Sequence, residues 1–177
     1  FDVLSPRVAV ALGIDVNRAH TQGRGMYHYH GLPTGLLWAA RNAAPSLAMH
    51  LLGYAADGFP IYGPWIPTEA NDVNSALKRA TPSYRVKGGN RPDGPGGAHD
   101  GKFGKDWEYV AGTGDLDECN GRIGPDGTYR YHATDAFPYI IGCFAGTSAT
   151  QSGNAAADMP PMGGNGGNPP PAPSPRA

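Results

Sequence analysis

Two short stretches of the chain alternate tyrosine with a charged or polar side chain. Gly25–His30 reads Gly-Met-Tyr-His-Tyr-His, and Gly127–His132 reads Gly-Thr-Tyr-Arg-Tyr-His. Because successive side chains of a β-strand point to opposite faces, each stretch places its tyrosines on one face and its histidines, or Arg130, on the other. The pattern therefore predicts two short strands, each with one polar face.

Two apolar stretches predict further strands. Within residues 50–64, Asp57-Gly58 separates two apolar runs, which is typical of a β-hairpin turn. Pro60 cannot donate a ladder hydrogen bond, so the second strand of this hairpin is expected at a sheet edge or with a bulge. The strongly apolar run at residues 137–144 is expected as a core strand.

Two segments favour short helices. The run Pro33–Ala40 is followed by Pro45, which would end or interrupt a helix. The segment Thr68–Arg79 begins with a capping residue, has acids near its start and bases at its end, and so suits the helix dipole. Both would be short helices beside a sheet.

The remaining sequence is rich in loop-forming residues. Residues 88–114 combine Gly, Asp and Pro with an aromatic island, which predicts a long loop pinned by Trp107 and Tyr109. After Gly146 the composition shifts to Ser, Ala, Gly and Asn, and then to the proline-rich run at residues 168–176. We therefore expect a mainly β fold. It would be a single loop-rich antiparallel domain, a sandwich or an irregular sheet, over residues 1–147, with one or two short helices and an extended Gly/Pro-rich tail over 148–177.

Composition narrows the functional classes. The chain has 27 glycines and 18 prolines in 177 residues, but its 10% aromatic content favours a packed interior. Only 16% of residues are charged and the formal net charge is −1, so nucleic-acid binding is not expected. No apolar run is long enough to span a bilayer. The first residue is Phe1 rather than Met, which fits an exported mature form, although a truncated chain would begin in the same way.

The two cysteines, Cys119 and Cys143, are expected to form a disulfide. Closing a loop of this size stabilises a fold by roughly 3 kcal/mol in the loop-entropy treatment. Two reduced thiols, or a soft-metal site shared with histidines, are the alternatives. A disulfide together with the exported start favours an extracellular or cell-surface location.

Histidines are the candidate metal ligands. If the two motif strands lie side by side, His28, His30 and His132 could share one ion, and three imidazoles suit zinc or copper. His50 is a candidate fourth ligand, and His20 is expected in the approach loop rather than in the site. The alternatives are an ordinary half-buried strand with hydrogen-bonded imidazoles, and a polar site without metal.

Two features weigh on the choice of ion. Arg130 stands where a symmetric site would have a histidine, and a guanidinium cannot bind a metal cation, so the second motif offers one ligand at most. Calcium is a less favoured candidate because acidic residues are frequent in one part of the chain but match no EF-hand and also suit turns. These residues are Asp93, Asp100, Asp106, Asp115 and Asp117.

Together these motifs resemble the YHYH domain family. The resemblance rests on Tyr27–His30 and on the runs at residues 52–64, 114–122, 127–132 and 137–144, and it covers residues 20–146. It implies a secreted or surface protein. Arg130 departs from the family pattern, in which an aromatic residue or histidine is expected.

Two functional classes follow from the sequence. In the first, the chain is an extracellular structural or interaction module. Its motif histidines organise the core, either around one metal ion or without one, and its proline-rich tail joins it to further copies, or to matrix or filament neighbours. In the second, the same histidines hold copper or zinc with an open position, as in an enzyme or a metal-handling protein. We favour the first class, and therefore expect a structural or interaction protein rather than an enzyme.

Overall fold

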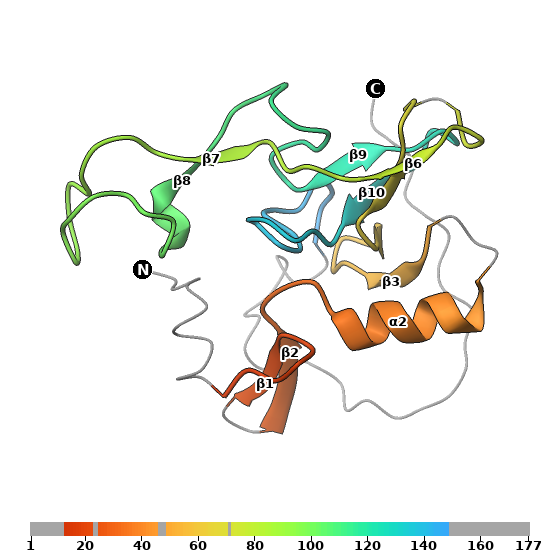
Figure 1. Cartoon of the computed structure of the whole chain (residues 1–177), viewed down its shortest axis with the longest axis horizontal. Coiled ribbons are helices and arrows are strands. Elements are labelled where there is room, and N and C mark those ends of the chain that lie inside the picture. Colours follow the sequence, from red (N-terminus) through yellow and green to blue (C-terminus); the bar gives the residue numbers. More distant parts are fainter. Residues whose placement is uncertain (1–12, 23–24, 46–48, 71, 149–177) are drawn as a thin grey trace.

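The computed structural model describes residues 13–22, 25–45, 49–70 and 72–148. Over these residues the fold is mainly β, as predicted, with ten short strands in four small sheets and one α-helix (Figure 1). In chain order the elements are β1 Ala19–Gln22, β2 Met26–Tyr29, α2 Thr34–Ala43, β3 Leu51–Tyr54, β4 Pro60–Tyr62, β5 Trp65–Pro67, β6 Leu77–Arg79, β7 Tyr84–Val86, β8 Trp107–Tyr109, β9 Gly121–Ile123 and β10 Tyr129–His132. The predicted tail lies almost wholly outside the described residues.

The largest sheet has four strands in the order β3-β4-β10-β9. Its two hairpins, β3–β4 and β9–β10, are antiparallel, and they join through a parallel pairing of β4 with β10. The other sheets are the antiparallel pairs β1–β2, β5–β6 and β7–β8. In the view of Figure 1 the β1–β2 pair lies below the central sheet and the β7–β8 pair lies to its left.

The hairpin predicted around Asp57-Gly58 is present as β3–β4. Gly58 has a φ of 87°, which glycine adopts without strain, and the Asp57 carboxylate accepts the Phe59 backbone N–H across the turn. Pro60 is the first residue of β4, but β4 lies inside the sheet, so the expectation of an edge strand is wrong. A bulge does occur, in the partner strand β3, where the register shifts between Leu51 and Gly53.

The tyrosine face of the second motif builds the centre of the core. Tyr131 is fully buried among Ala55, Cys119 and the half-buried ring of Phe59. Its ring meets that of Tyr129 edge to face at 5.2 Å between ring centroids. Both tyrosine hydroxyls donate to carboxylates, Tyr131 to Asp57 at 2.5 Å and Tyr129 to Asp117 at 2.8 Å. The predicted alternation of faces therefore holds in this strand.

The helix predicted at residues 33–40 is present as α2, but the second predicted helix is wrong. Residues 65–79 form the β5–β6 hairpin, in which Ile66 is fully buried. The connection is a turn in which the Asp72 carboxylate accepts the Asn74 N–H, and Thr68 donates its hydroxyl to the Ala76 carbonyl. Side chains that bond nearby backbone groups compete with helix formation, so the apparent capping residues serve a turn instead.

The apolar run at residues 137–144 is not a strand, contrary to expectation. It forms an irregular loop with a cis peptide bond between Phe137 and Pro138, and Tyr139 has a φ of 70°. Phe137 stacks on Trp107, with 5.0 Å between ring centroids and an interplanar angle of 11°. Trp107 therefore pins the predicted long loop as expected, although strand β8 and a 3₁₀ turn at Gly104–Asp106 interrupt that loop.

Four of the five acidic residues that suggested calcium bond other groups of the protein, namely Asp100, Asp106, Asp115 and Asp117. Arg91 binds both carboxylate oxygens of the fully buried Asp106 and one oxygen of Asp100. The hydrogen bond from Arg91 is the main reason that the pKa of Asp106 lies well below its ordinary value. Asp115 pairs with Lys78. Among the described residues, the one group of at least three clustered candidate ligands consists of histidines and includes none of these carboxylates.

Candidate metal site

The first motif forms the second strand of a small hairpin. Strand β1 pairs with β2 in a register that places His20 directly opposite His28. Side chains directly opposite in an antiparallel pair have Cβ atoms about 5 Å apart, so the two imidazoles are neighbours. Gly25, directly before β2, has a φ of 77°, a backbone conformation that glycine adopts more easily than other residues.

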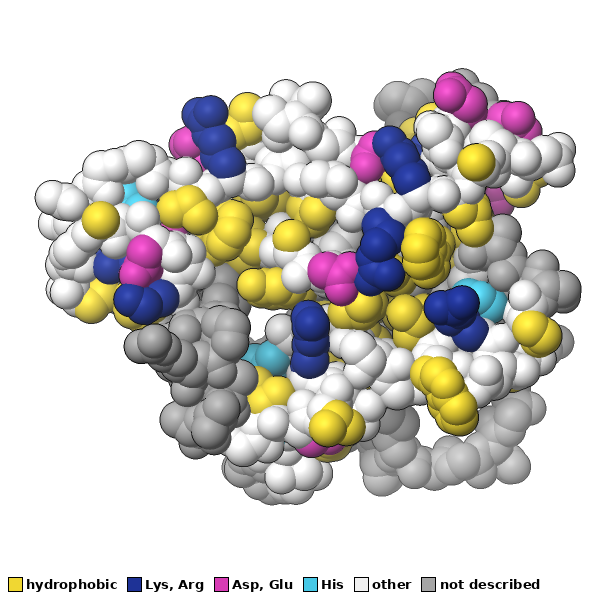
Figure 2. Space-filling model, viewed as in Figure 1, with side chains coloured by type: hydrophobic (Ala, Val, Ile, Leu, Met, Phe, Trp, Pro, Cys, Tyr) yellow, Lys and Arg dark blue, Asp and Glu magenta, His cyan; other side chains and the backbone are white. Residues whose placement is uncertain are grey.

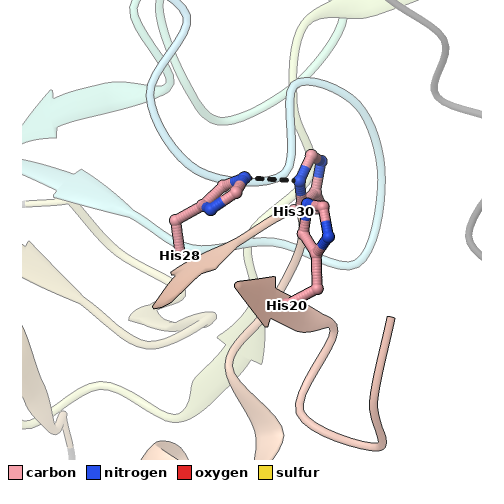
Figure 3. Close-up of side chains that lie close together, drawn as sticks. All are labelled: His20, His28 and His30. Carbon is pink, nitrogen blue, oxygen red and sulfur yellow. Dashed lines mark hydrogen bonds between the residues drawn. The ribbon is translucent and has the colours of Figure 1, made fainter. Parts of the chain in front are cut away.

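His30 completes a cluster of three histidines. It follows β2 directly and lies two residues after His28, so both side chains are on the same face of the hairpin as His20. The Nε2 atoms of His28 and His30 are 2.8 Å apart, and the three ring centroids lie 4.6–4.9 Å from one another. Figure 3 shows the three rings converging above the hairpin.

The cluster has the dimensions of a metal site. One ligand nitrogen from each ring can be chosen so that all three lie within 4.8 Å of one another. Nitrogen–metal bonds are about 2.0–2.1 Å, so two nitrogens on one ion lie at most about 4.2 Å apart. The 2.8 Å separation between His28 and His30 already meets this limit, and small rotations would bring His20 within it. Three imidazoles leave at least one coordination position for water or another ligand.

The local electrostatics favour the neutral imidazole of His30, the form that binds metal. His30 is exposed overall, but desolvation of its ring within the cluster lowers its pKa, and the neighbouring charges of His28 and His20 lower that pKa further. One proton must lie between His28 and His30 in the hydrogen-bonded pair. An ion would replace that proton, so metal binding at this site would release protons and depend on pH.

The opposite face of the hairpin is held by tyrosines. Tyr27 donates its hydroxyl to the Asp15 carboxylate at 2.6 Å, and its ring meets Tyr29 edge to face at 5.6 Å between centroids. The Asp15 carboxylate also accepts the Ala19 N–H at the start of β1. The predicted alternation therefore holds in the first motif too, and the tyrosine face orients the histidine face.

His132 and His50, expected as ligands in the same site, lie elsewhere. His132 is in β10, an interior strand of the four-stranded sheet, whereas β2 pairs with β1. The buried His132 ring donates from Nδ1 to the Gly63 carbonyl at 2.9 Å. His50 is buried just before β3. Neither belongs to the histidine cluster, which is the one group of at least three potential metal ligands among the described residues.

Arg130, the residue that breaks the symmetry of the repeat, makes contacts that stabilise the fold. It is buried, pairs with Asp126, and its guanidinium carbon lies 5.1 Å from the ring centroid of Tyr62. The two copies of the motif thus lie in different sheets, and their polar faces do not converge on one centre as the sequence had suggested.

His20 is the residue that sequence reasoning assigned to a loop. The signal that could have placed it is the pair Gly23 and Gly25 immediately before the motif, because a short glycine-containing connection favours a hairpin. Pairing across such a turn brings a histidine eight residues upstream opposite His28. The site therefore keeps His28 and His30 from the predicted set and gains His20.

Cys119 and Cys143 form the predicted disulfide, with 4.6 Å between their Cα atoms. It ties the turn before β9 to the irregular loop that follows β10, close to Asn120, whose buried side-chain amide donates to the His132 and Ile140 carbonyls. The described residues include no free cysteine, so a thiolate metal site is excluded there.

The comparisons with known proteins agree with the motif. A family model described as YHYH protein matches residues 2–146. No curated protein matches the chain, and no solved structure matches it. In the part of the chain that the structure describes, no helix has the length and apolar character needed to cross a membrane. By the extent of the family match, this chain belongs to the YHYH protein family.

Proposed function

We propose that this protein is an extracellular interaction module that binds one copper or zinc ion through His20, His28 and His30. The observation that carries the proposal is the convergence of three potential ligand nitrogens within 4.8 Å on one face of a two-stranded hairpin. An extracellular setting is supported by the disulfide, because such bonds persist in oxidising compartments. Imidazole suits both copper and zinc, and the ligand set favours neither.

The position of the cluster bears on what the ion would do. His20 and His28 are half-buried and His30 is exposed, and the hairpin lies outside the hydrophobic clusters of the core. An ion held here would order the β1–β2 hairpin rather than the whole domain. We therefore assign the ion a local role, either in binding a partner or in carrying metal.

Metal titration of the full chain tests this site. We expect one Zn²⁺ or Cu²⁺ per chain by calorimetry, with an affinity about 100-fold lower in His28→Ala and in His20→Ala, because each variant leaves only two imidazoles. The matched control is His99→Ala, since the His99 ring bonds the Gly88 carbonyl outside the cluster. Equal loss of affinity in the His99 and His28 variants, or unchanged affinity in His20→Ala, would contradict the assignment.

The open coordination position favours one alternative, in which the bound ion is catalytic or exchangeable. Three imidazoles leave room for water on zinc or copper, and the exposed His30 places that position at the surface. Added azide should then shift the visible absorption of the Cu²⁺-loaded protein. An unchanged spectrum would indicate a closed coordination sphere and leave only the interaction role.

We further propose that the chain associates with other copies, or with matrix neighbours, through its proline-rich segment. Residues 168–176 read Asn-Pro-Pro-Pro-Ala-Pro-Ser-Pro-Arg and lie outside the described residues. Proline-rich sequence loses little entropy when it docks on an aromatic groove.

Light scattering of the full chain tests the association. We expect replacement of Pro170 and Pro173 by serine to lower the apparent mass while metal content stays unchanged. An unaltered assembly in this variant would refute the role of the segment without touching the histidine site.

A further inference from the structure

A cleft of about 750 Å³ lies between helix α2 and the β5–β6 hairpin. Its walls include two tryptophans, two arginines, a histidine and an aspartate, namely Trp38, Trp65, Arg41, Arg79, His50 and Asp135. In Figure 2 hydrophobic side chains are exposed over this part of the surface, with basic side chains and a histidine beside them. The cleft does not include the three clustered histidines, and its volume is in the range of small-ligand sites.

The aromatic side chains of the cleft are not accounted for by the core. Helix α2 buries Leu37 against Leu32 and Ala133, but the neighbouring Trp38 is 69% exposed. Trp65 lines the same cleft from β5 and is half-buried. An indole left in water on a helix that already buries another face is typical of a binding surface, because tryptophan combines a large apolar area with a polar edge.

One pair of charged side chains is fixed on the wall of the cleft. Arg79 donates from both Nε and Nη2 to the same oxygen of Asp135, and its guanidinium carbon lies 5.1 Å from the Trp65 ring centroid. Neither Nη1 of Arg79 nor Oδ1 of Asp135 bonds another described residue. The pair therefore keeps one donor and one acceptor in set positions for a ligand.

Two further polar groups line the cleft without a partner in the described part of the chain. Arg41, in the last turn of α2, makes no ion pair there, and the ring of His50 makes no hydrogen bond there although its residue is only 6% exposed. Because Asp135 offsets Arg79, the charge of Arg41 is uncompensated. A nearly buried imidazole with free nitrogens is expected to bond something that enters the cleft.

We infer that this cleft binds an acidic oligosaccharide, a chain of sugar rings that carries carboxylates. A sugar ring has an apolar C–H face that can pack on an indole and hydroxyl edges that both donate and accept, which suits Trp38 together with the Arg79–Asp135 pair. The carboxylate would pair with Arg41, since guanidinium binds carboxylate through paired hydrogen bonds. The proline-rich segment at residues 168–176 fits less well, because its one charge, Arg176, has the same sign as the excess charge of the cleft.

Binding of a defined oligosaccharide to the full chain tests the inference. The probe is oligogalacturonate, and the matched ligand is its methyl ester, which keeps the sugar rings and removes the charge. By calorimetry we expect the ester to bind about tenfold more weakly, and the affinity of the free acid to fall with added salt. Trp38→Ala and Arg41→Gln should each lower the affinity for the acid about tenfold, and Arg41→Gln should also weaken the salt dependence.

Matched variants make the result specific. Arg85→Gln removes an exposed arginine from β7, on another sheet, and should leave the affinity within about twofold. His28→Ala should remove metal but not sugar binding. Circular dichroism checks the fold of the Trp38→Ala variant, which should match that of the unsubstituted chain because Trp38 is exposed. Equal affinity for the acid and its ester, unchanged affinity in both cleft variants, or quenching of tryptophan fluorescence by a peptide of residues 168–176 but not by the sugar, would overturn the inference.

Discussion

Replacing Tyr131 by alanine is expected to lower the free energy of unfolding by about 3–5 kcal/mol, the usual cost of truncating a buried aromatic ring. The ring is fully buried against Cys119, Ala55 and Phe59. Its hydroxyl donates to Asp57 and accepts the Ala145 N–H at 2.7 Å. The alanine variant would lose that packing and also leave the buried Asp57 carboxylate with one partner fewer. Urea denaturation followed by fluorescence measures the change.

The repeat supplies its own control. Tyr29 occupies the position equivalent to Tyr131 in the first copy, but it is 36% exposed. Tyr29→Ala should therefore cost less than about 1 kcal/mol. Tyr131→Phe keeps the ring and should cost about 1–3 kcal/mol through the lost hydroxyl contacts. If the Tyr29 and Tyr131 alanine variants were equally destabilised, the two copies would not differ in role as the structure indicates.

The local alternation of the repeat could be predicted from sequence, but the neighbours of each copy could not. In both copies tyrosines share one face and the polar side chains the other. Which strand pairs with each copy depends on contacts between residues far apart in the chain. Both copies pair with a strand only a few residues earlier, but the second copy also pairs with β4, about 70 residues earlier, and is buried. The first copy has no such second partner among the described residues and stays at the surface.

The two wrong predictions of secondary structure have a common cause. Thr68, Asp72 and Ser75 suit a helix start, but each also bonds backbone in a turn, and burial of Ile66 in the β5–β6 pair decides between these outcomes. The apolar run after β10 likewise has the composition of a strand. It is instead an irregular loop, fixed by the disulfide and by stacking of Phe137 on Trp107. Tertiary contacts outweigh local preference in both segments.

Two of the three histidines of the candidate metal site could be predicted from sequence. His28 and His30 share a face because they are two residues apart in and just after a strand, which sequence alone indicates. His20 joins them through cross-strand register, which depends on the length of the connection before the motif. His132 was grouped with them because its motif looks alike, but a repeated sequence does not require a shared site. In this fold, one copy offers exposed ligands and the other stabilises the core.

The burial of His132 leads to a second large effect, a loss of stability in mild acid. Burial is the main cause that lowers the pKa of His132 to about 4. A histidine in the unfolded chain has a pKa of about 6.5, so between these values the unfolded state binds a proton that the folded state does not. Stability is therefore fully present above pH 6.5 and is lost as the pH falls toward 4. The difference corresponds to about 3 kcal/mol of unfolding free energy.

Denaturation at a series of pH values, with and without two substitutions, isolates this effect. His132→Asn keeps a donor near the Gly63 carbonyl but does not titrate, so its stability should be nearly flat between pH 6.5 and about pH 5, although lower at neutral pH. His30→Ala removes the equivalent histidine of the exposed copy, whose pKa burial lowers in the same direction, and should keep most of the slope. Hydrogen bonds from Lys102 and Arg91 lower the pKa values of Asp100 and Asp106, so the stability that these carboxylates contribute begins to fall only below about pH 5, where aspartates of the unfolded chain take up protons. The contribution of His132 is therefore read from the slope between pH 6.5 and about pH 5. The opposite result would be a dependence of stability on pH that vanished in His30→Ala and persisted in His132→Asn. It would assign the acid sensitivity to the exposed histidine cluster and contradict a role for the buried His132.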